Sequence, residues 1–320
     1  MTSTGVAVTE IEKTPNRRIG PALLLGYLAL YAVTLLAMQR QGNFDVSEPL
    51  LVLAIVGVGF SVAAGLLTIG VKPLPYSVRQ PRNELIVISI YLLPVVAFIT
   101  WGLGAIHRYI PADPADAFTI LTAKLLVFVV IPAAIMHGMF GYSLRQLAPM
   151  AAPPRQVLVM AAMSILLLGF QAVLGSGMRD ISNAHLPASK LLAGVPLAFL
   201  WLALEAGVVE EFFFRVLLQA RLSAVLRSEL GGIMVMALLF GLAHAPGLYL
   251  RTGITHKGLG AHPSFLMAAG YSIVLISVAG FFLGVLWART CNFALVVVIH
   301  AAGDLLPNLL PTLRSIGVVK

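Results

Sequence analysis

The chain has 320 residues, of which 59% are hydrophobic and 11% charged, and its mean hydropathy is +0.95. A soluble domain carries roughly 25% charged residues, so this composition excludes an ordinary soluble protein and predicts a polytopic membrane protein. The single cysteine, Cys291, excludes an intramolecular disulfide and a multi-thiolate metal site. The net charge of +8 is expected to set membrane topology, so membrane lipid is an expected partner and nucleic acid is not.

Apolar runs long enough to cross the roughly 30 Å hydrocarbon core recur along the chain. They predict an all-α fold, a polytopic transmembrane helical bundle with eight or nine membrane helices, the number depending on the last run. In chain order the runs are 19–38, 50–71, 85–106, 119–141, 157–176, 191–219, 231–250, 264–287 and 293–313.

The distribution of polar residues divides the chain into four segments. Residues 1–18 are polar and without apolar period, which predicts a disordered N-terminus. Lys and Arg are modestly more frequent in the loops expected on the side of that segment, which favours a cytoplasmic N-terminus. N-terminal transmembrane helices are expected over 19–190, a chemistry-bearing transmembrane core over 191–313, and a C-terminal tail over 314–320.

Ionisable residues within the apolar runs gather in the last third of the chain, whereas the first five runs contain almost none. Each such residue costs about 2.5 to 3.5 kcal/mol at the centre of a membrane helix, so a functional reason is expected. The intramembrane ionisable residues of this region are Glu205, Glu210, Glu211, Arg215, His244, His300 and Asp304.

The spacing of these residues places three motifs at similar depth. The helix that carries Glu210 is expected to turn at 228–232, where two glycines adjoin. Glu210 then lies about 20 residues before the turn and His244 about 13 after it, a difference of roughly 10 Å that tilt or an earlier turn can absorb. The next turn is expected at 288–292, and His300 follows about 10 residues later on the same side.

Within one helix, Glu211 and Arg215 form an i,i+4 pair in the favourable order and neutralise each other. Glu210 points about 100° away around the helix, which leaves it free to face His244. A free carboxylate beside a histidine is suited to activating water against a carbonyl. Phe240 precedes His244 by one turn and is expected to pack beneath its imidazole.

His300 and Asp304 are again spaced i,i+4, so this carboxylate can orient the imidazole or share a ligand site with it. The remaining ionisable residues have simpler interpretations. His137 is expected to form a helix-packing hydrogen bond, and Glu205 to pack between helices or face a cavity. Arg221 and Arg227 are expected to be topology residues.

The three motifs resemble those of the CPBP (CAAX protease and bacteriocin-processing, or Abi) family of intramembrane proteases, which includes the type II CAAX prenyl endopeptidases. The resemblance covers about 195–310 and extends to the flanking stretches LLFGLAH and GVLWARTCNFALVVVIHAAGD. The motifs are EExxxR as Glu210, Glu211 and Arg215; FxxxH as Phe240 and His244; and HxxxN/D as His300 and Asp304.

The resemblance implies an intramembrane endopeptidase, with 191–313 as its catalytic core. It implies Glu210 and His244 as the groups that activate water, and His300 with Asp304 as those that hold the oxyanion or a metal. Two positions depart from the family pattern. Position 216 is Val where the family has Gly, and Asp304 stands where the prenyl endopeptidases have Asn. An ionised Asp304 cannot donate a hydrogen bond to an oxyanion, so it must be protonated, orient His300 or bind a metal.

Metal-free catalysis is favoured, and no cofactor is expected. Zinc is the alternative, with His244, His300 and Asp304 as ligands, because such sites take imidazole and carboxylate donors. A zinc site needs four donors near 2.0 to 2.2 Å from the ion, whereas water activation needs only hydrogen-bond reach of one water.

The leading interpretation is a peptidase acting on peptides or membrane proteins, which include membrane-associated or prenylated-like substrates. From the short loops and the lack of a eukaryotic targeting signal, we expect a bacterial cytoplasmic membrane protein. Two alternatives stay open: a proton- or ion-coupled transporter that uses the same residues as a relay, and a non-enzymatic membrane scaffold or immunity protein. Paired broken helices in two similar halves, which would favour transport, are not found in the sequence.

Overall fold

The computed structural model describes residues 15–41, 44–250, 259–260 and 262–319. Within these ranges the regular structure is helical, and nine helices are long and apolar enough to cross a membrane. The predicted all-α bundle is therefore confirmed, with the larger of the two expected helix numbers. Most of the segment predicted to be disordered, residues 1–14, lies outside the described residues.

The first five spans are apolar along most of their length, and three of them contain a π-helical segment, labelled η, between α-helical parts. They consist of α1 (Ile19–Gln39); α2 (Ser47–Val52), η1 (Leu53–Phe60) and α3 (Ser61–Leu67); α4 (Pro81–Ala97), η2 (Phe98–Gly102) and α5 (Leu103–Tyr109); α6 (Ala115–Leu125), η3 (Leu126–Val130) and α7 (Ile131–Phe140); and α9 (Pro154–Leu174).

The last four spans contain every motif residue, and two short helices, α8 (Leu144–Leu147) and α10 (Gly177–Asn183), lie in the preceding connections. These spans consist of α11 (Ala188–Leu202), η4 (Ala203–Val208), η5 (Glu211–Gln219) and α12 (Ala220–Leu226); α13 (Glu229–Leu250); α14 (Phe265–Tyr271), η6 (Ser272–Ile276) and α15 (Ser277–Thr290); and α16 (Phe293–Ser315).

The turn between the sixth and seventh spans lies earlier than the pair of glycines predicted. Helix α12 ends at Leu226, Arg227 adopts the left-handed conformation with φ 51°, and α13 begins at Glu229. A left-handed residue commonly ends a helix, because it turns the chain away from the helix axis. Glu210 and His244 are therefore almost equally far from the turn, and the expected difference in depth disappears.

The turn between the last two spans is where the sequence predicts it. Cys291 adopts the left-handed conformation with φ 45°, and the side chain of Asn292 accepts a hydrogen bond from the backbone N–H of Leu295. Asparagine is a favoured residue at a helix N-cap because it satisfies one of the free N–H groups there. This cap fixes the start of α16, which carries His300.

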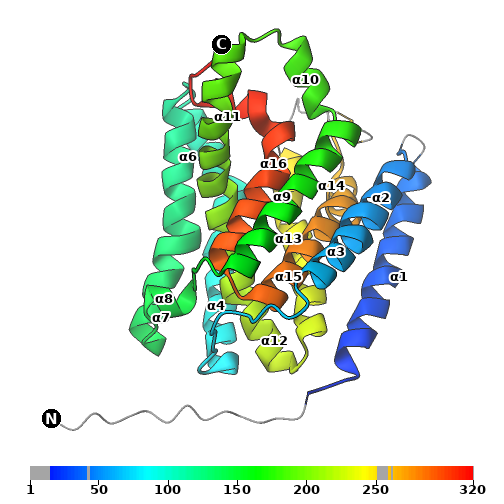
Figure 1. The fold of residues 1–320 in the computed structure, drawn as a ribbon, viewed down its shortest axis with the longest axis vertical. Helices are drawn as coiled ribbons and strands as arrows, with labels where there is room; N and C mark the ends of the chain where they lie inside the picture. The colour runs from blue at the N-terminus through cyan, green and yellow to red at the C-terminus, as the bar shows by residue number, and fades with distance from the viewer. Residues whose placement is uncertain (1–14, 42–43, 251–258, 261, 320) are drawn as a thin grey trace, which may run out of the picture.

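Burial is greatest in the last four spans, which therefore form the centre of the bundle. The buried share of the most apolar window rises from 17% in the first span to 61% in the last. In Figure 1, α13, α15 and α16 lie between α1 to α3 on one side and α6 on the other. The N-terminal spans contact this centre directly, since the ring of Phe60 lies 5.8 Å from that of Phe282 in α15.

Candidate functional site

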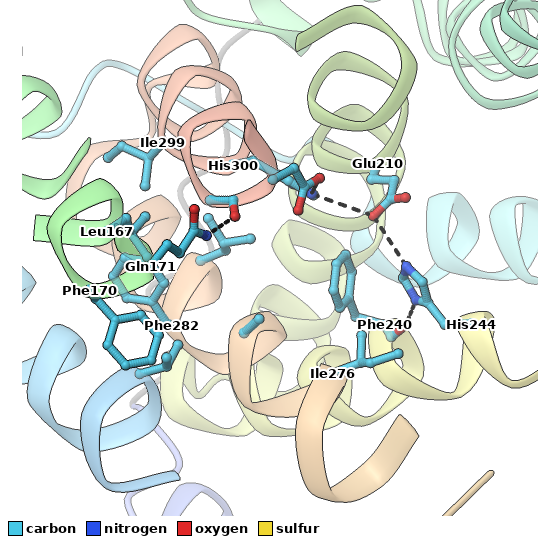
Figure 2. A pocket seen from close by; sticks show the side chains of 15 residues that line it. Leu167, Phe170, Gln171, Glu210, Phe240, His244, Ile276, Phe282, Ile299 and His300 are labelled. Atoms are coloured by element: carbon cyan, nitrogen blue, oxygen red, sulfur yellow. Dashed lines mark hydrogen bonds and ion pairs between the residues drawn. The ribbon is translucent and has the colours of Figure 1, made fainter. Parts of the chain in front are cut away.

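Glu210 and His244 belong to two different spans, and their side chains face each other. Glu210 lies between η4 and η5, two of the six π-helical segments among the described residues. The Nδ1 of His244 lies 2.8 Å from the carbonyl of Phe240, which can only accept, so Nδ1 is the donor. The Nε2 atom consequently faces Glu210, 3.7 Å from its Oε2 (Figure 2).

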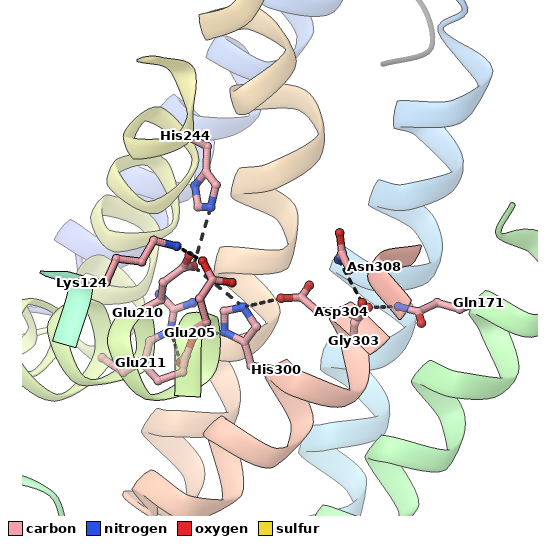
Figure 3. A network of polar contacts seen from close by, with 11 residues as sticks. Lys124, Gln171, Glu205, Glu210, Glu211, His244, His300, Gly303, Asp304 and Asn308 are labelled. Carbon is pink, nitrogen blue, oxygen red and sulfur yellow. Dashed lines mark hydrogen bonds and ion pairs between the residues drawn. The ribbon is translucent and has the colours of Figure 1, made fainter. Parts of the chain in front are cut away.

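His300 of α16 lies among three carboxylates (Figure 3). Its Nδ1 donates to Oε1 of Glu211 at 2.7 Å, and its Nε2 lies 3.4 Å from Asp304 and 3.9 Å from Oε2 of Glu210. The other oxygen of Glu211 forms an ion pair with Nε of Arg215 at 3.0 Å. Glu211 therefore joins Arg215 to His300, a bridge that the i,i+4 pattern did not predict.

Phe240 forms an apolar floor beneath the two histidines. Its ring centroid lies 5.0 Å from that of His244 and 6.2 Å from that of His300. The guanidinium of Arg215 lies over the same ring, 4.6 Å from its centroid, at a distance typical of a cation–π contact. The Phe240 ring thus contacts Arg215 and both histidines.

The site is open on one side and closed on the other. Fully buried side chains form the Glu211–Arg215 end, whereas the end with Asp304 and His244 is partly exposed. The exposed fractions are 0% for Glu211 and Arg215, 8% for His300, 18% for Glu210, 33% for His244 and 34% for Asp304.

A cavity of about 340 Å³ adjoins Glu210, His244, His300 and Asp304. Beyond these side chains its wall is mostly apolar, and it includes residues of the second, fifth and eighth spans (Figure 2). The other lining residues are Val56, Leu167, Phe170, Gln171, Phe240, Ile276, Ala279, Phe282, Leu283, Ile299 and Gly303.

Two polar contacts near the site were not predicted. Lys124 of α6 pairs with Glu205 of η4, and Gln171 of α9 donates to the carbonyl of Gly303 (Figure 3). Lys124 and Glu205 carry opposite charges inside different apolar runs, which is the signal that could have paired them. The sequence provides no comparable signal for Gln171.

The expectation that Arg221 is a topology residue is wrong. Its side chain is fully buried and forms an ion pair with the equally buried Glu84 of α4, with Nε 2.9 Å from Oε2. A buried arginine needs such a partner because an unpaired charge in the protein interior is costly. The two residues lie in different spans, so no local spacing indicated the pair.

The described residues contain no group of three or more His, Cys, Asp or Glu side chains arranged to hold a metal ion. His300 does show one feature of metal-binding histidines, because its Nδ1 donates to a carboxylate. Zinc binding by His244, His300 and Asp304 remains a prediction of the sequence.

The fold and the site define an integral membrane protein with a glutamate–histidine cluster inside its helical bundle. Residues 192–306 match a family model described as Type II CAAX prenyl endopeptidase Rce1-like, which relates the chain to the CPBP/CAAX proteases, as its motifs predict. The match contains all seven motif residues and none of the first five spans. No curated protein and no solved structure matches the chain. The family supports a CAAX-type intramembrane protease and offers no support for transport or scaffolding.

Proposed function

We propose that the protein is an intramembrane endopeptidase in which Glu210 activates water to hydrolyse a peptide bond. One observation carries the proposal: Oε2 of Glu210 is buried, has no protein hydrogen-bond partner among the described residues, and lies within 4 Å of Nε2 of both His244 and His300. Separations of 3.7 and 3.9 Å exceed a direct hydrogen bond, so neither histidine takes up the acceptor capacity of this oxygen, and Glu210 borders the cavity from which a water would come.

In this reaction Glu210 takes a proton from the water while the water oxygen bonds to the substrate carbonyl carbon. The carbonyl oxygen becomes an oxyanion. The C–N bond then breaks, and the proton held between Glu210 and Nε2 of His244 passes to the leaving nitrogen. The carbonyl of Phe240 fixes the tautomer of His244, so its Nε2 is available to share that proton.

His300 is the proposed donor to the oxyanion. Its two ring nitrogens face carboxylates, Glu211 on Nδ1 and Asp304 on Nε2, and only an imidazolium can donate to both. A protonated His300 supplies the N–H that an ionised Asp304 cannot, and Asp304 serves as its counter-ion. An aspartate at position 304, where the prenyl endopeptidases have asparagine, is thereby compatible with oxyanion stabilisation.

The mostly apolar cavity supports membrane-associated substrates, because an apolar chain segment or lipid group can occupy it beside the polar groups. Prenylated-like peptides and membrane proteins belong to this class. We place the protein in a bacterial cytoplasmic membrane with its N-terminus inside.

The alternative of a metal site has its own test. Zinc content is measured by elemental analysis of the purified protein, and activity is measured before and after zinc chelation.

The deciding experiment is proteolysis by the purified, detergent-solubilised protein on prenylated and unprenylated peptides. We expect cleavage by the wild type and a loss of about 10² to 10⁴-fold in Glu210→Gln, since the change removes a general base and keeps the side-chain shape. Glu229→Gln, at the start of α13, is the matched control and should cleave normally. A fully active Glu210→Gln would refute the role of Glu210, and a wild type that cleaves no peptide would favour transport or binding.

A further inference from the structure

A buried polar cluster adjoins η5, and none of its residues lines the cavity. Arg221 donates from Nε to Glu84, whose other carboxylate oxygen accepts from the hydroxyl of Tyr142 at 2.9 Å and from the backbone N–H of Gln80 at 2.6 Å. Glu84, Arg221 and Tyr142 are at most 1% exposed. Each of the two oxygens of Glu84 is therefore held by the cluster, and Arg221 cannot move without breaking an ion pair.

The cluster ends on one backbone carbonyl of η5. The Val216 oxygen accepts from the hydroxyl of Tyr76 at 2.7 Å and from Nη1 of Arg221 at 2.6 Å. The same Nη1 lies 2.6 Å from the Tyr76 hydroxyl, so two side-chain donors and one carbonyl form a triangle. Side-chain donors that bind helix carbonyls compete with the regular backbone ladder and favour irregular winding.

Val216 directly follows Arg215, and η5 begins at Glu211. The winding of this segment sets the direction of the carboxylate that binds His300. A helix wound as a regular α-helix would rotate these side chains relative to one another, because a π-helix bonds residue i to i+5 instead of i+4. The two hydrogen bonds that Tyr76 and Arg221 donate to the Val216 carbonyl, here called the clamp, therefore affect the site through the backbone of η5.

We propose that Tyr76, with the Glu84–Arg221 pair behind it, is a positioning residue that holds η5 in its π-helical winding and so aims Glu211 at His300. Tyr76, Glu84 and Tyr142 lie outside the segment that matches the family, so the N-terminal spans of this chain supply part of the support of its site.

Both hydroxyls remain donors over the working pH range. Tyr76 and Tyr142 lie in the connections between spans, where burial raises the pKa of Tyr76 and raises that of Tyr142 to about 12. The clamp is therefore neutral at its tyrosines and charged only at the Glu84–Arg221 pair. Replacing Tyr76 by phenylalanine removes one hydroxyl and is the mildest change that tests the proposed role of Tyr76.

The test is Tyr76→Phe, with Tyr91→Phe as the matched control. Phenylalanine keeps the edge-on contact of the Tyr76 ring with Trp287 and loses only the hydroxyl. The hydroxyl of Tyr91 donates at 2.7 Å to the carbonyl of Val127 in η3, also a π-helical segment but outside the catalytic motifs. Both variants lose a hydrogen bond from a hydroxyl to a helix carbonyl, and Tyr76→Phe also loses the bond from Nη1 of Arg221, which keeps its bond to the Val216 carbonyl.

Two measurements separate positioning from stability. In peptide cleavage, kcat is expected to fall about tenfold in Tyr76→Phe, with KM and melting temperature equal to those of Tyr91→Phe, because misaligned groups slow the chemical step. In ¹⁵N-histidine NMR, the ring-nitrogen signals of His300 should shift in Tyr76→Phe and not in Tyr91→Phe. Equal effects in both variants, no effect in Tyr76→Phe, or a loss of activity matched by a fall in melting temperature would overturn the proposal.

The kinetic measurement rests on the proposed function, whereas the NMR measurement does not. If the wild type cleaves no peptide, the peptidase proposal fails and the His300 signals alone decide whether Tyr76 aims Glu211. Unchanged His300 signals in Tyr76→Phe would refute positioning even if the wild type cleaves.

Discussion

Glu210 and Glu211 are adjacent in the chain, but their surroundings differ. Glu210 borders the cavity and faces two histidines, whereas Glu211 is fully buried between Arg215 and His300. The carboxylate of Glu210 can reach a substrate in the cavity, whereas both oxygens of Glu211 already contact charged or polar side chains of the protein. The two residues should therefore respond differently to the same substitution.

Glu211→Gln is expected to destabilise the protein by about 3 to 5 kcal/mol, because it leaves the fully buried Arg215 without its counter-ion. Glu210→Gln, whose carboxylate has no arginine partner, is the control and should keep the melting temperature near that of the wild type. Thermal unfolding in detergent measures both. Equal melting temperatures for the two variants would contradict the assignment of Glu211 as the structural carboxylate.

Cys291, in the turn before α16, should be a poor nucleophile at neutral pH. Burial, with a smaller effect of Glu229, raises the pKa of its thiol to about 11. Only the thiolate reacts, so labelling by iodoacetamide is expected to be slow at pH 7 and to accelerate about tenfold per pH unit toward pH 11. Glu229→Gln should shift this profile to slightly lower pH. A rate that reaches its plateau near pH 9 would show an ordinary thiol.

At the scale of elements, the position of α13 depends on one close crossing. Gly241 lies three residues before His244, and a Cβ at this position would come within 2.6 Å of the Ser272 carbonyl and 2.8 Å of the Ser277 Cβ. Backbone and Cβ atoms cannot move aside as a flexible side chain can. The glycine therefore lets α13 approach η6 and α15, and this approach places His244 opposite Glu210.

Gly241→Ala is expected to cost about 1 to 3 kcal/mol through overpacking and to lower cleavage by moving His244. Gly247→Ala is the matched control on the same helix, because a Cβ there meets no atom within 4 Å. Melting temperature and kcat are measured for both. A Gly241→Ala protein with wild-type stability and activity would show that the crossing tolerates a side chain.

At the scale of the whole molecule, the last four spans form a buried centre that the first five surround in part. The cavity takes Val56, Leu167 and Phe170 from these outer spans, so substrate access depends on both parts of the chain. The exposed end of the site, at His244 and Asp304, indicates the direction from which water enters.

Cysteines placed at Glu210, His244 and His300 in a Cys291→Ser background should all react with a small polar thiol reagent from one and the same side of the membrane. They border one cavity, and hydrolysis requires water there. Leu93→Cys is the control, since Leu93 is 72% exposed on an apolar span and is expected to face lipid. Membrane vesicles of the two orientations supply the measurement. Labelling of the three positions from opposite sides would refute a shared water-filled site.

The sequence by itself determined the helical class, the approximate position of each span and the motif residues. Apolar runs of membrane length specify spans directly, since every backbone group must be bonded within its own helix in lipid. Contacts at i,i+4, such as Glu211–Arg215 and His300–Asp304, also follow from local geometry.

Only the tertiary structure decided which side chains meet across helices. Glu211 and His300 are 89 positions apart, Lys124 and Glu205 are 81, and Glu84 and Arg221 are 137. No periodicity links such partners, because helix rotation, the place of each turn and the π-helical winding together set their contacts. The sequence shows that these charges must be paired within the membrane, and the packing of the helices selects the partner.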